Sequence, residues 1–291
     1  MITGNYYTYL IASLIKLERG VRPRFTLGDF LRVKRKFIEE VHWPFVDIIL
    51  RRYDGLNLHH LLTGEGRFLP WGTYSQEELK RWLEEEEEGE GGREEFPQFM
   101  QAYLEEYKAG KIEKIDPLDR LLELYYYEAL STPNLFLRRF FTFEVILINV
   151  VTALRARAKS LEVKDYLICK DGLPLSLSAD IISVSDTIIK NFSVTDFGLG
   201  RELPWIKEVS ALVEQGDFLS LEEKLDEIKW GKIDELTAYI YFDVEVVLAY
   251  ILKLLILERW REAEGDLGGR IREELVAAAT AKEEEVSWEI G

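Results

Sequence analysis

The stretch Phe143 to Arg157, FEVILINVVTALRAR, is almost entirely apolar, and it restricts the possible folds more than any other feature of the chain. A surface helix has an apolar stripe on one side only, whereas a helix that is apolar all round must be covered by neighbours on every side. The segment therefore predicts a central helix. It also predicts enough other helices to surround that one.

Two polar side chains, Glu144 and Asn149, interrupt this stretch. An unpaired polar group in a protein interior costs about 1–3 kcal/mol, so both are predicted to have partners. Glu144 is expected near the start of the helix, where free backbone N–H groups favour an anion. Candidate partners for its carboxylate are Arg138, Arg139 and Arg155. We therefore expect Glu144 to stabilise the fold and not to act as an acid or base.

Two other segments repeat the order apolar residue, acid, two β-branched residues, leucine. They are VDIILRRYDGLNLHHLL, with Asp47, and VEVVLAYILKLLILER, with Glu245. The three acids are separated by about a hundred residues, or a third of the chain, and self-similarity at a fixed period is typical of repeat architectures. We expect an all-α protein of three similar helical units, residues 1–96, 97–195 and 196–291. Asp47, Glu144, Asn149 and Glu245 would be its buried polar residues.

Local signals predict helices elsewhere too. Asp116 followed by Pro117 is typical of a helix start, and Ser220 with Glu223 has the spacing of a capping box. The segment 26–41 has Phe30, Val33, Phe37 and Val41 at helical spacing, which predicts one apolar face. The run Glu84–Glu88 is expected to be a solvated helix end or a loop.

Charge and cysteine content restrict partners and compartment. The net charge is −16, which disfavours nucleic acid as a partner because phosphate backbones repel it. Cys169 is the only cysteine, so no intramolecular disulfide is expected. No apolar run is long enough to predict a spanning helix, and no signal peptide is recognised at the N-terminus. We expect a cytoplasmic protein.

The sequence predicts neither catalytic chemistry nor a cofactor. His59 and His60 are adjacent and point apart on a helix, which disfavours a shared metal, and His42 is distant in sequence. There is no phosphate-binding loop and no nucleophile elbow. We therefore expect no catalytic, cofactor-binding or metal-binding residues, and we expect that the protein is not an enzyme.

Several stretches resemble a known family. FFTFEVILINVVTALRARA, with Asn149, and RRYDGLNLHHLL, with Asp54, Asn57 and Leu58, resemble a recurring helix of the C subunit (or d subunit) of V-type and A-type ATPases. NYYTYLIASL, TDFGLGRELPWI, EEKLDEIKW and YFDVEVVLAYILKLLILERW are closer to a bacterial family of unknown function associated with V-type ATPase genes. The chain departs from the ATPase pattern in its shorter length, its weak first repeat and its acidic run.

The resemblance implies a three-part helical funnel that is a non-catalytic coupling subunit in the central stalk. Its partners would be the central shaft and the membrane proteolipid ring of a proton- or sodium-transporting ATPase. It would be peripheral to the inner membrane through those partners alone. The alternatives are a helical scaffold or adaptor of another complex and, less favoured, a helical enzyme.

Overall fold

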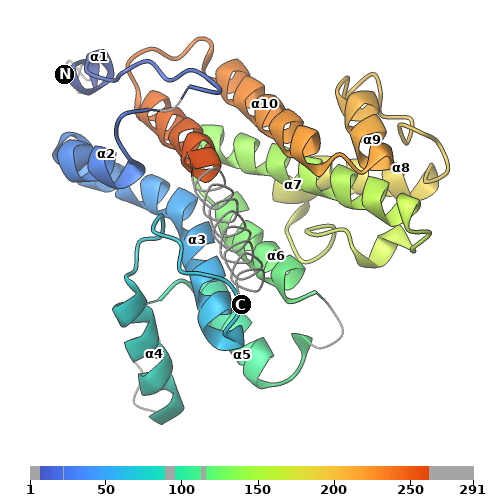
Figure 1. Ribbon diagram of the computed structural model, residues 1–291, viewed down its shortest axis with the longest axis horizontal. Coiled ribbons are helices and arrows are strands. Elements are labelled where there is room, and N and C mark those ends of the chain that lie inside the picture. Colours follow the sequence, from blue (N-terminus) through green and yellow to red (C-terminus); the bar gives the residue numbers. More distant parts are fainter. Residues whose placement is uncertain (1–6, 22, 89–95, 113–115, 262–291) are drawn as a thin grey trace, which may run out of the picture.

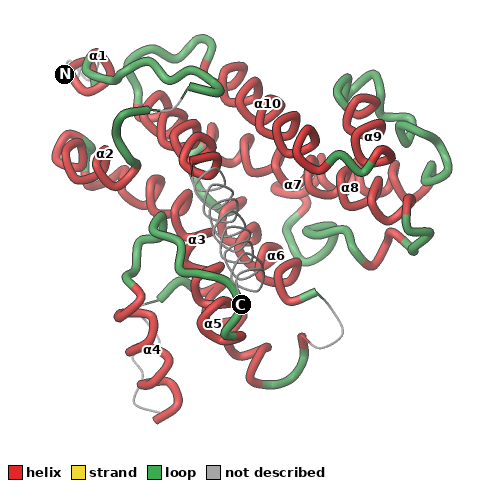
Figure 2. Tube along the Cα trace, in the orientation of Figure 1, coloured by secondary structure: helices red, strands yellow, loops and turns green. Residues whose placement is uncertain are grey.

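Helices account for all regular structure in the part of the chain that the structure describes, residues 7–21, 23–88, 96–112 and 116–261 of this computed structural model (Figure 2). The prediction of an all-α protein is therefore confirmed. The α-helices are α1 (Thr8–Ala12), α2 (Leu27–Lys34), α3 (Trp43–Thr63), α4 (Gln76–Glu88), α5 (Gln98–Lys108), α6 (Pro117–Leu130), α7 (Leu135–Ala158), α8 (Leu175–Lys190), α9 (Ile206–Gln215) and α10 (Phe218–Thr237). Residues 244–261 are also helical. Short 3₁₀ helices are Arg35–Phe37, Glu40–His42 and Val163–Asp165.

Helix α7 is the centre of the fold. It contacts α6, α8, α9 and α10 and runs beside α10 in Figure 1, while α3 packs against α6. Buried side chains occur at many positions of α7, including the adjacent pairs Val150 and Val151 and Ala153 and Leu154. The central helix expected around residues 143–157 is thus confirmed.

The helical residues 244–261 pack against segments from the beginning of the chain. Glu258 is buried, and its carboxylate accepts hydrogen bonds from the backbone N–H of Leu27 (3.2 Å) and the indole N–H of Trp71 (3.3 Å). Tyr250 donates to the carbonyl of Ile15 at 3.0 Å. One acidic side chain therefore joins the first turn of α2, the connection after α3 and the last described helix.

Two hydrophobic clusters fill the interior. The first extends from Tyr7 to Leu255 and includes side chains of α3, α5, α6, the first half of α7 and residues 244–255. The second lies around the last half of α7 and includes Ile188, Phe197 and Leu221. The first cluster contains residues from all three predicted ranges, 1–96, 97–195 and 196–291. The division into three similar units and the funnel shape stay predictions.

Of the two helix starts predicted from local signals, the one at Asp116 is confirmed and the one at Ser220 is wrong. Asp116 does cap α6, accepting from the N–H of Leu118, with Pro117 at the first position. The capping box at Ser220 was wrong, because α10 begins earlier and Asp217 accepts from the N–H of Ser220.

The single apolar face predicted over residues 26–41 was also wrong. Phe30 is buried but Val33, in the same helix, is not, and α2 ends at Lys34, so the 3₁₀ turn that follows takes Phe37 and Val41 out of the helical spacing. Val33 is 52% exposed and Val41 is 69% exposed.

The acidic run Glu84–Glu88 forms the end of α4, and Glu84 and Glu85 are exposed, as expected of a solvated helix end; residues 89–95 lie outside the described part. Among the described residues no helix combines the length and apolar character needed to cross a membrane.

Candidate functional site

Glu144 lies well inside α7 and not near its start. The helix begins at Leu135, where Asn134 caps it by accepting from the N–H of Leu137 at 3.0 Å. The prediction that free N–H groups at a helix end would stabilise the carboxylate was therefore wrong. Residues 135–143 extend the helix by more than two turns before Glu144.

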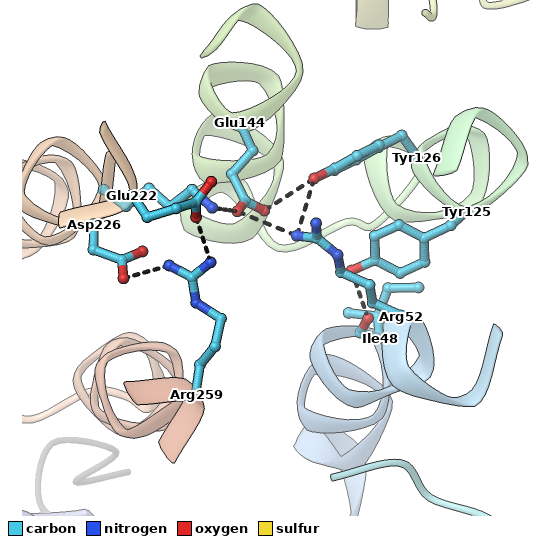
Figure 3. Close-up of polar contacts among 9 residues, drawn as sticks. Ile48, Arg52, Tyr125, Tyr126, Glu144, Glu222, Asp226 and Arg259 are labelled. Atoms are coloured by element: carbon cyan, nitrogen blue, oxygen red, sulfur yellow. Dashed lines mark hydrogen bonds and ion pairs between the residues drawn. The ribbon is translucent and has the colours of Figure 1, made fainter. Parts of the chain in front are cut away.

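Side chains from three other helices surround the Glu144 carboxylate (Figure 3). Arg52 of α3 lies 3.6 Å away and Lys229 of α10 lies 3.5 Å away, and the Tyr126 hydroxyl of α6 donates to it at 3.3 Å. The expectation of an arginine partner is met, but Arg52 takes the place of the three arginines of α7 that the sequence suggested. Glu144 joins helices that are far apart in the sequence.

Two tyrosines of α6 bind α3 near this site. The Arg52 Nη1 donates to the Tyr126 hydroxyl at 3.5 Å, and the Tyr125 hydroxyl donates to the carbonyl of Ile48 at 3.0 Å, one turn earlier in α3. Burial raises the pKa of both phenols well above its usual value. Both therefore stay neutral and act as hydrogen-bond donors.

A second ionic group lies beside the first, where α10 meets residues 244–261. Arg259 pairs with Glu222 at 2.8 Å and with the buried carboxylate of Asp226. Asp226 also accepts from the indole N–H of Trp260 at 2.6 Å. Figure 3 shows Arg259 extended toward both acids, so this cation is well satisfied.

Between the two ionic groups lies a cavity of about 410 Å³. Apolar and aromatic side chains form much of its wall, including Tyr53 and Trp71, whose ring centroids are 5.1 Å apart in an edge-on arrangement. Its charged lining consists of four cations and two carboxylates: Arg52, Arg67, Lys229, Arg259, Glu144 and Asp226. Burial lowers the pKa of the Lys229 ammonium, the Glu144 carboxylate opposes this shift, and Arg52 adds to it.

Asn149 has the structural role that was expected of it. Its side-chain amide donates to the carbonyl of Ile168 at 3.0 Å and its oxygen accepts from the N–H of the same residue at 3.0 Å. It also lies 3.3 Å from the hydroxyl of Ser185 in α8. A buried amide thus holds the connection between α7 and α8 against the centre of the fold.

The prediction that Asp47 and Glu245 are buried was wrong. Both are half-buried, since each lies in the first turns of its helix, beside solvent. Burial still raises the pKa of Asp47, with Arg51 opposing, and Glu245 accepts from the side-chain amide of Asn134 at 2.9 Å. Whether the three acids are repeat-equivalent stays a prediction.

Two polar residues of the RRYDGLNLHHLL stretch are fully buried in α3. Asp54 accepts from the backbone N–H of Thr73 (2.7 Å) and of Tyr74 (3.1 Å) and from the Thr73 hydroxyl (2.7 Å). Asn57 exchanges a pair of hydrogen bonds with the backbone of Leu69, at 2.9 and 2.6 Å. Together they bind the connection between α3 and α4 to α3.

The histidines and the cysteine have separate environments. His42 contacts the Tyr7 hydroxyl at 2.5 Å, His59 contacts the Tyr103 hydroxyl at 2.7 Å, and His60 contacts the carbonyl of Arg67 at 2.7 Å. Burial raises the pKa of the Cys169 thiol. In the described ranges no group of three or more His, Cys, Asp or Glu side chains could hold a metal ion.

A family described as "Protein of unknown function (DUF2764)" matches residues 3–282. The chain belongs to this family. No curated protein and no solved structure matches it. In this DUF2764 chain, the match includes every residue that lines the cavity between the two ionic groups (the ionic cavity).

Sequence reasoning missed most of that cavity. Arg52, Lys229, Asp226 and Arg259 were not singled out, because each lies among many other charged residues. One available signal was Arg52, which directly follows the apolar run Ile48–Leu50 and Arg51 in α3. In this DUF2764 chain the arrangement can hold charge away from bulk water.

Proposed function

We propose that the protein is a non-catalytic coupling subunit of a V-type ATPase. In this role it links the central rotor shaft to the membrane proteolipid ring, from the cytoplasmic side. It associates with the membrane through those partners alone. The proposal starts from the resemblance of α3 and α7 to the recurring helix of the ATPase C subunit.

The observation that supports it best is the use of the polar residues in those resembling stretches. Asp54 and Asn57 in α3, and Asn149 in α7, each bind the backbone of a connection that follows their own helix. The cavity is lined by other residues. A part that transmits torque needs connections held rigidly to its helices, and buried, fully hydrogen-bonded polar groups provide that rigidity.

An exposed apolar edge is the candidate contact surface. It consists of Ile15, Tyr239, Tyr241 and Phe242, and Tyr239 is 91% exposed. Ile240, which lies between Tyr239 and Tyr241 in the sequence, lines a groove of about 450 Å³ beside α10 together with Ile15. Exposed apolar clusters of this kind mark protein interaction sites.

The test is co-sedimentation of the protein with membranes that contain the proteolipid ring. The variant Tyr239→Ser/Tyr241→Ser/Phe242→Ser should bind at least about tenfold more weakly, a loss of about 1.4 kcal/mol. The matched control is Leu161→Ser/Tyr166→Ser/Leu175→Ser, which removes exposed apolar side chains elsewhere and should bind like the wild type.

Salt gives a second measure. A chain of net charge −16 is attracted to the Lys- and Arg-rich cytoplasmic loops of membrane proteins, so its binding should weaken as salt rises. Failure of the folded wild-type protein to bind at any salt concentration would favour the alternative, a helical scaffold of another complex. Equal loss in both triple variants would remove the apolar edge from the proposal.

A further inference from the structure

The cavity between α3, α7 and α10 has two cations that share one carboxylate. Arg52 and Lys229 both lie at 3.5–3.6 Å from Oε1 of Glu144, longer than a charge-assisted hydrogen bond of about 2.7–2.9 Å. Arg259, by contrast, has its own acids at the other end of the cavity. Within the described part of the chain, Arg52 and Lys229 are therefore the loosely held cations of the site.

Burial makes the charge of Lys229 costly without a further anion. Burial lowers the pKa of Lys229 because the charged form loses solvation, and the Arg52 guanidinium adds to the effect. A guanidinium has five N–H donors in a planar fork, and the contact of Arg52 with Tyr126 at 3.5 Å is a weak one. Both cations have unused capacity to bind oxygen atoms.

The cavity also has the size and the walls of a ligand site. Its volume of about 410 Å³ lies within the usual range for small-molecule pockets, about 300–1,000 Å³. The rings of Tyr53, Trp71 and Phe140 make part of the wall apolar and aromatic. Such a pocket fits a molecule with one charged end and one apolar or aromatic end.

The charge selects the ligand class. Four cations line the cavity against two carboxylates, in a chain whose net charge is −16. We propose that this cavity binds a small phosphate monoester, with the phosphate between Arg52 and Lys229 and an apolar or aromatic organic group against Tyr53 and Trp71. A phosphate offers several acceptor oxygens and about two negative charges at neutral pH, which matches two adjacent cations better than a carboxylate does. This site is independent of the coupling role.

The test uses phenyl phosphate as the probe and titration calorimetry on the full chain. Two control probes separate the contributions: inorganic phosphate has the charge without the ring, and benzyl alcohol has the ring without the charge. Phenyl phosphate should bind at least about tenfold more tightly than either. Equal affinity for phenyl phosphate and inorganic phosphate would overturn the assignment of the aromatic wall, and no binding of phenyl phosphate would overturn the proposal.

Two variants should act in opposite directions. Lys229→Gln removes one cation and should weaken phenyl phosphate binding by about tenfold or more. Glu144→Gln removes the competing carboxylate and should tighten binding, because Arg52 and Lys229 then face the phosphate alone. Lys232→Gln is the matched control, since Lys232 lies one turn further along α10, outside this cavity, and should have no effect.

Proton uptake gives an independent readout. The bound phosphate should raise the pKa of Lys229 back toward its usual value, so the protein should take up protons when it binds phenyl phosphate at alkaline pH. This uptake is measured by calorimetry, as a dependence of the binding enthalpy on the ionisation enthalpy of the buffer. Lys229→Gln should abolish this uptake. If Glu144→Gln does not fold, Lys229→Gln and Lys232→Gln alone decide the question: equal binding in both would overturn the proposal.

Discussion

At the scale of single residues, burial of polar groups is the main feature of this protein. Asp54, Asn57, Glu144 and Asn149 are buried in long helices, and each has hydrogen-bond or ionic partners. Their partners differ in kind. Glu144 meets charged side chains, whereas the other three bind backbone groups of connections, and these two arrangements respond differently to mutation and to pH.

Asp54 should make stability depend on pH. Burial raises its pKa to about 6, against hydrogen bonds from Thr73 and Tyr74 that lower it. A carboxyl group whose pKa is higher in the folded state than in the unfolded state favours folding at low pH. As pH rises from about 4 to about 6, this group should therefore reduce the free energy of unfolding, by about 2–3 kcal/mol.

Asp54→Asn tests this directly. The amide oxygen can accept from the backbone N–H groups of Thr73 and Tyr74, and the amide nitrogen can donate to the Thr73 hydroxyl. Urea unfolding at a series of pH values measures the free energy of unfolding of both proteins. As pH rises, the wild type should lose stability relative to Asp54→Asn, because Asp54 ionises and the amide does not. At low pH the difference between the two proteins should become smaller. Parallel curves would contradict the pKa of Asp54.

Asn149→Leu should destabilise the protein by about 1–3 kcal/mol, because the backbone N–H and carbonyl of Ile168 lose their partners inside the protein. Ser185→Ala is the control. It removes only the hydroxyl that lies 3.3 Å from the amide and should cost less, about 1 kcal/mol or below. Thermal melts of both variants measure the effect, and an Asn149→Leu melt like that of the wild type would contradict it.

At the scale of helices and connections, the fold depends on side chains that join ends of helices to distant segments. Thr26 and Asp29 form a capping box at the start of α2, and Glu258 binds the N–H of Leu27 in the same turn. Helix α2 has eight residues, too few for stability alone in water. These contacts should therefore decide whether α2 forms.

Glu258→Leu should cost about 2–4 kcal/mol, because it leaves two buried donors, the N–H of Leu27 and the indole of Trp71, without an acceptor. Glu258→Gln keeps an amide oxygen at the same place and should cost less. Hydrogen exchange should locate the effect in α2 and in residues 244–261. Uniform loss of protection with no preference for these segments would contradict the assigned role of Glu258.

The sequence was informative about elements whose signals are local. The central helix, the cap at Asp116 and the buried, partnered state of Asn149 follow from apolar content, from a two-residue start signal and from the cost of an unpaired amide. The end of α2 at Lys34 did not follow, since nothing between Lys34 and Val41 marks a break. The cap of α10 was misplaced because Asp217 competes with Ser220 for the same role.

The ionic cavity could not be derived from local signals. Arg52, Glu144 and Lys229 come from three helices separated by long stretches of chain, and only the packing of those helices brings them together. In a chain with 37 basic and 53 acidic residues, too many pairings are possible for sequence spacing to select one. Burial selects it, and burial depends on the complete fold.

At the scale of the whole molecule, α7, α8 and α10 each contribute buried side chains to both hydrophobic clusters. Ile181 and Ile188 both lie in α8 and are fully buried, but Ile181 belongs to the first cluster and Ile188 to the second. The two clusters should therefore respond separately to the loss of one side chain.

Ile181→Ala and Ile188→Ala should each cost about 2–5 kcal/mol by leaving a cavity. Ile188→Ala should lower native-state hydrogen-exchange protection mainly in α8 and α9, while α3 and α6 keep theirs. Ile181→Ala should lower protection in α3 and α6 as well. Identical exchange patterns in the two variants would mean that the clusters open as one unit.

The place of residues 244–261 has a consequence for synthesis of the protein on the ribosome. Val247, Leu248 and Ile251 belong to the same cluster as Tyr7 and Phe30, which are synthesised long before them. The apolar surface that residues 244–261 cover in the folded protein therefore stays exposed until those residues have been synthesised. A nascent chain of this kind is exposed to aggregation until then, and should depend on chaperones that bind it before release.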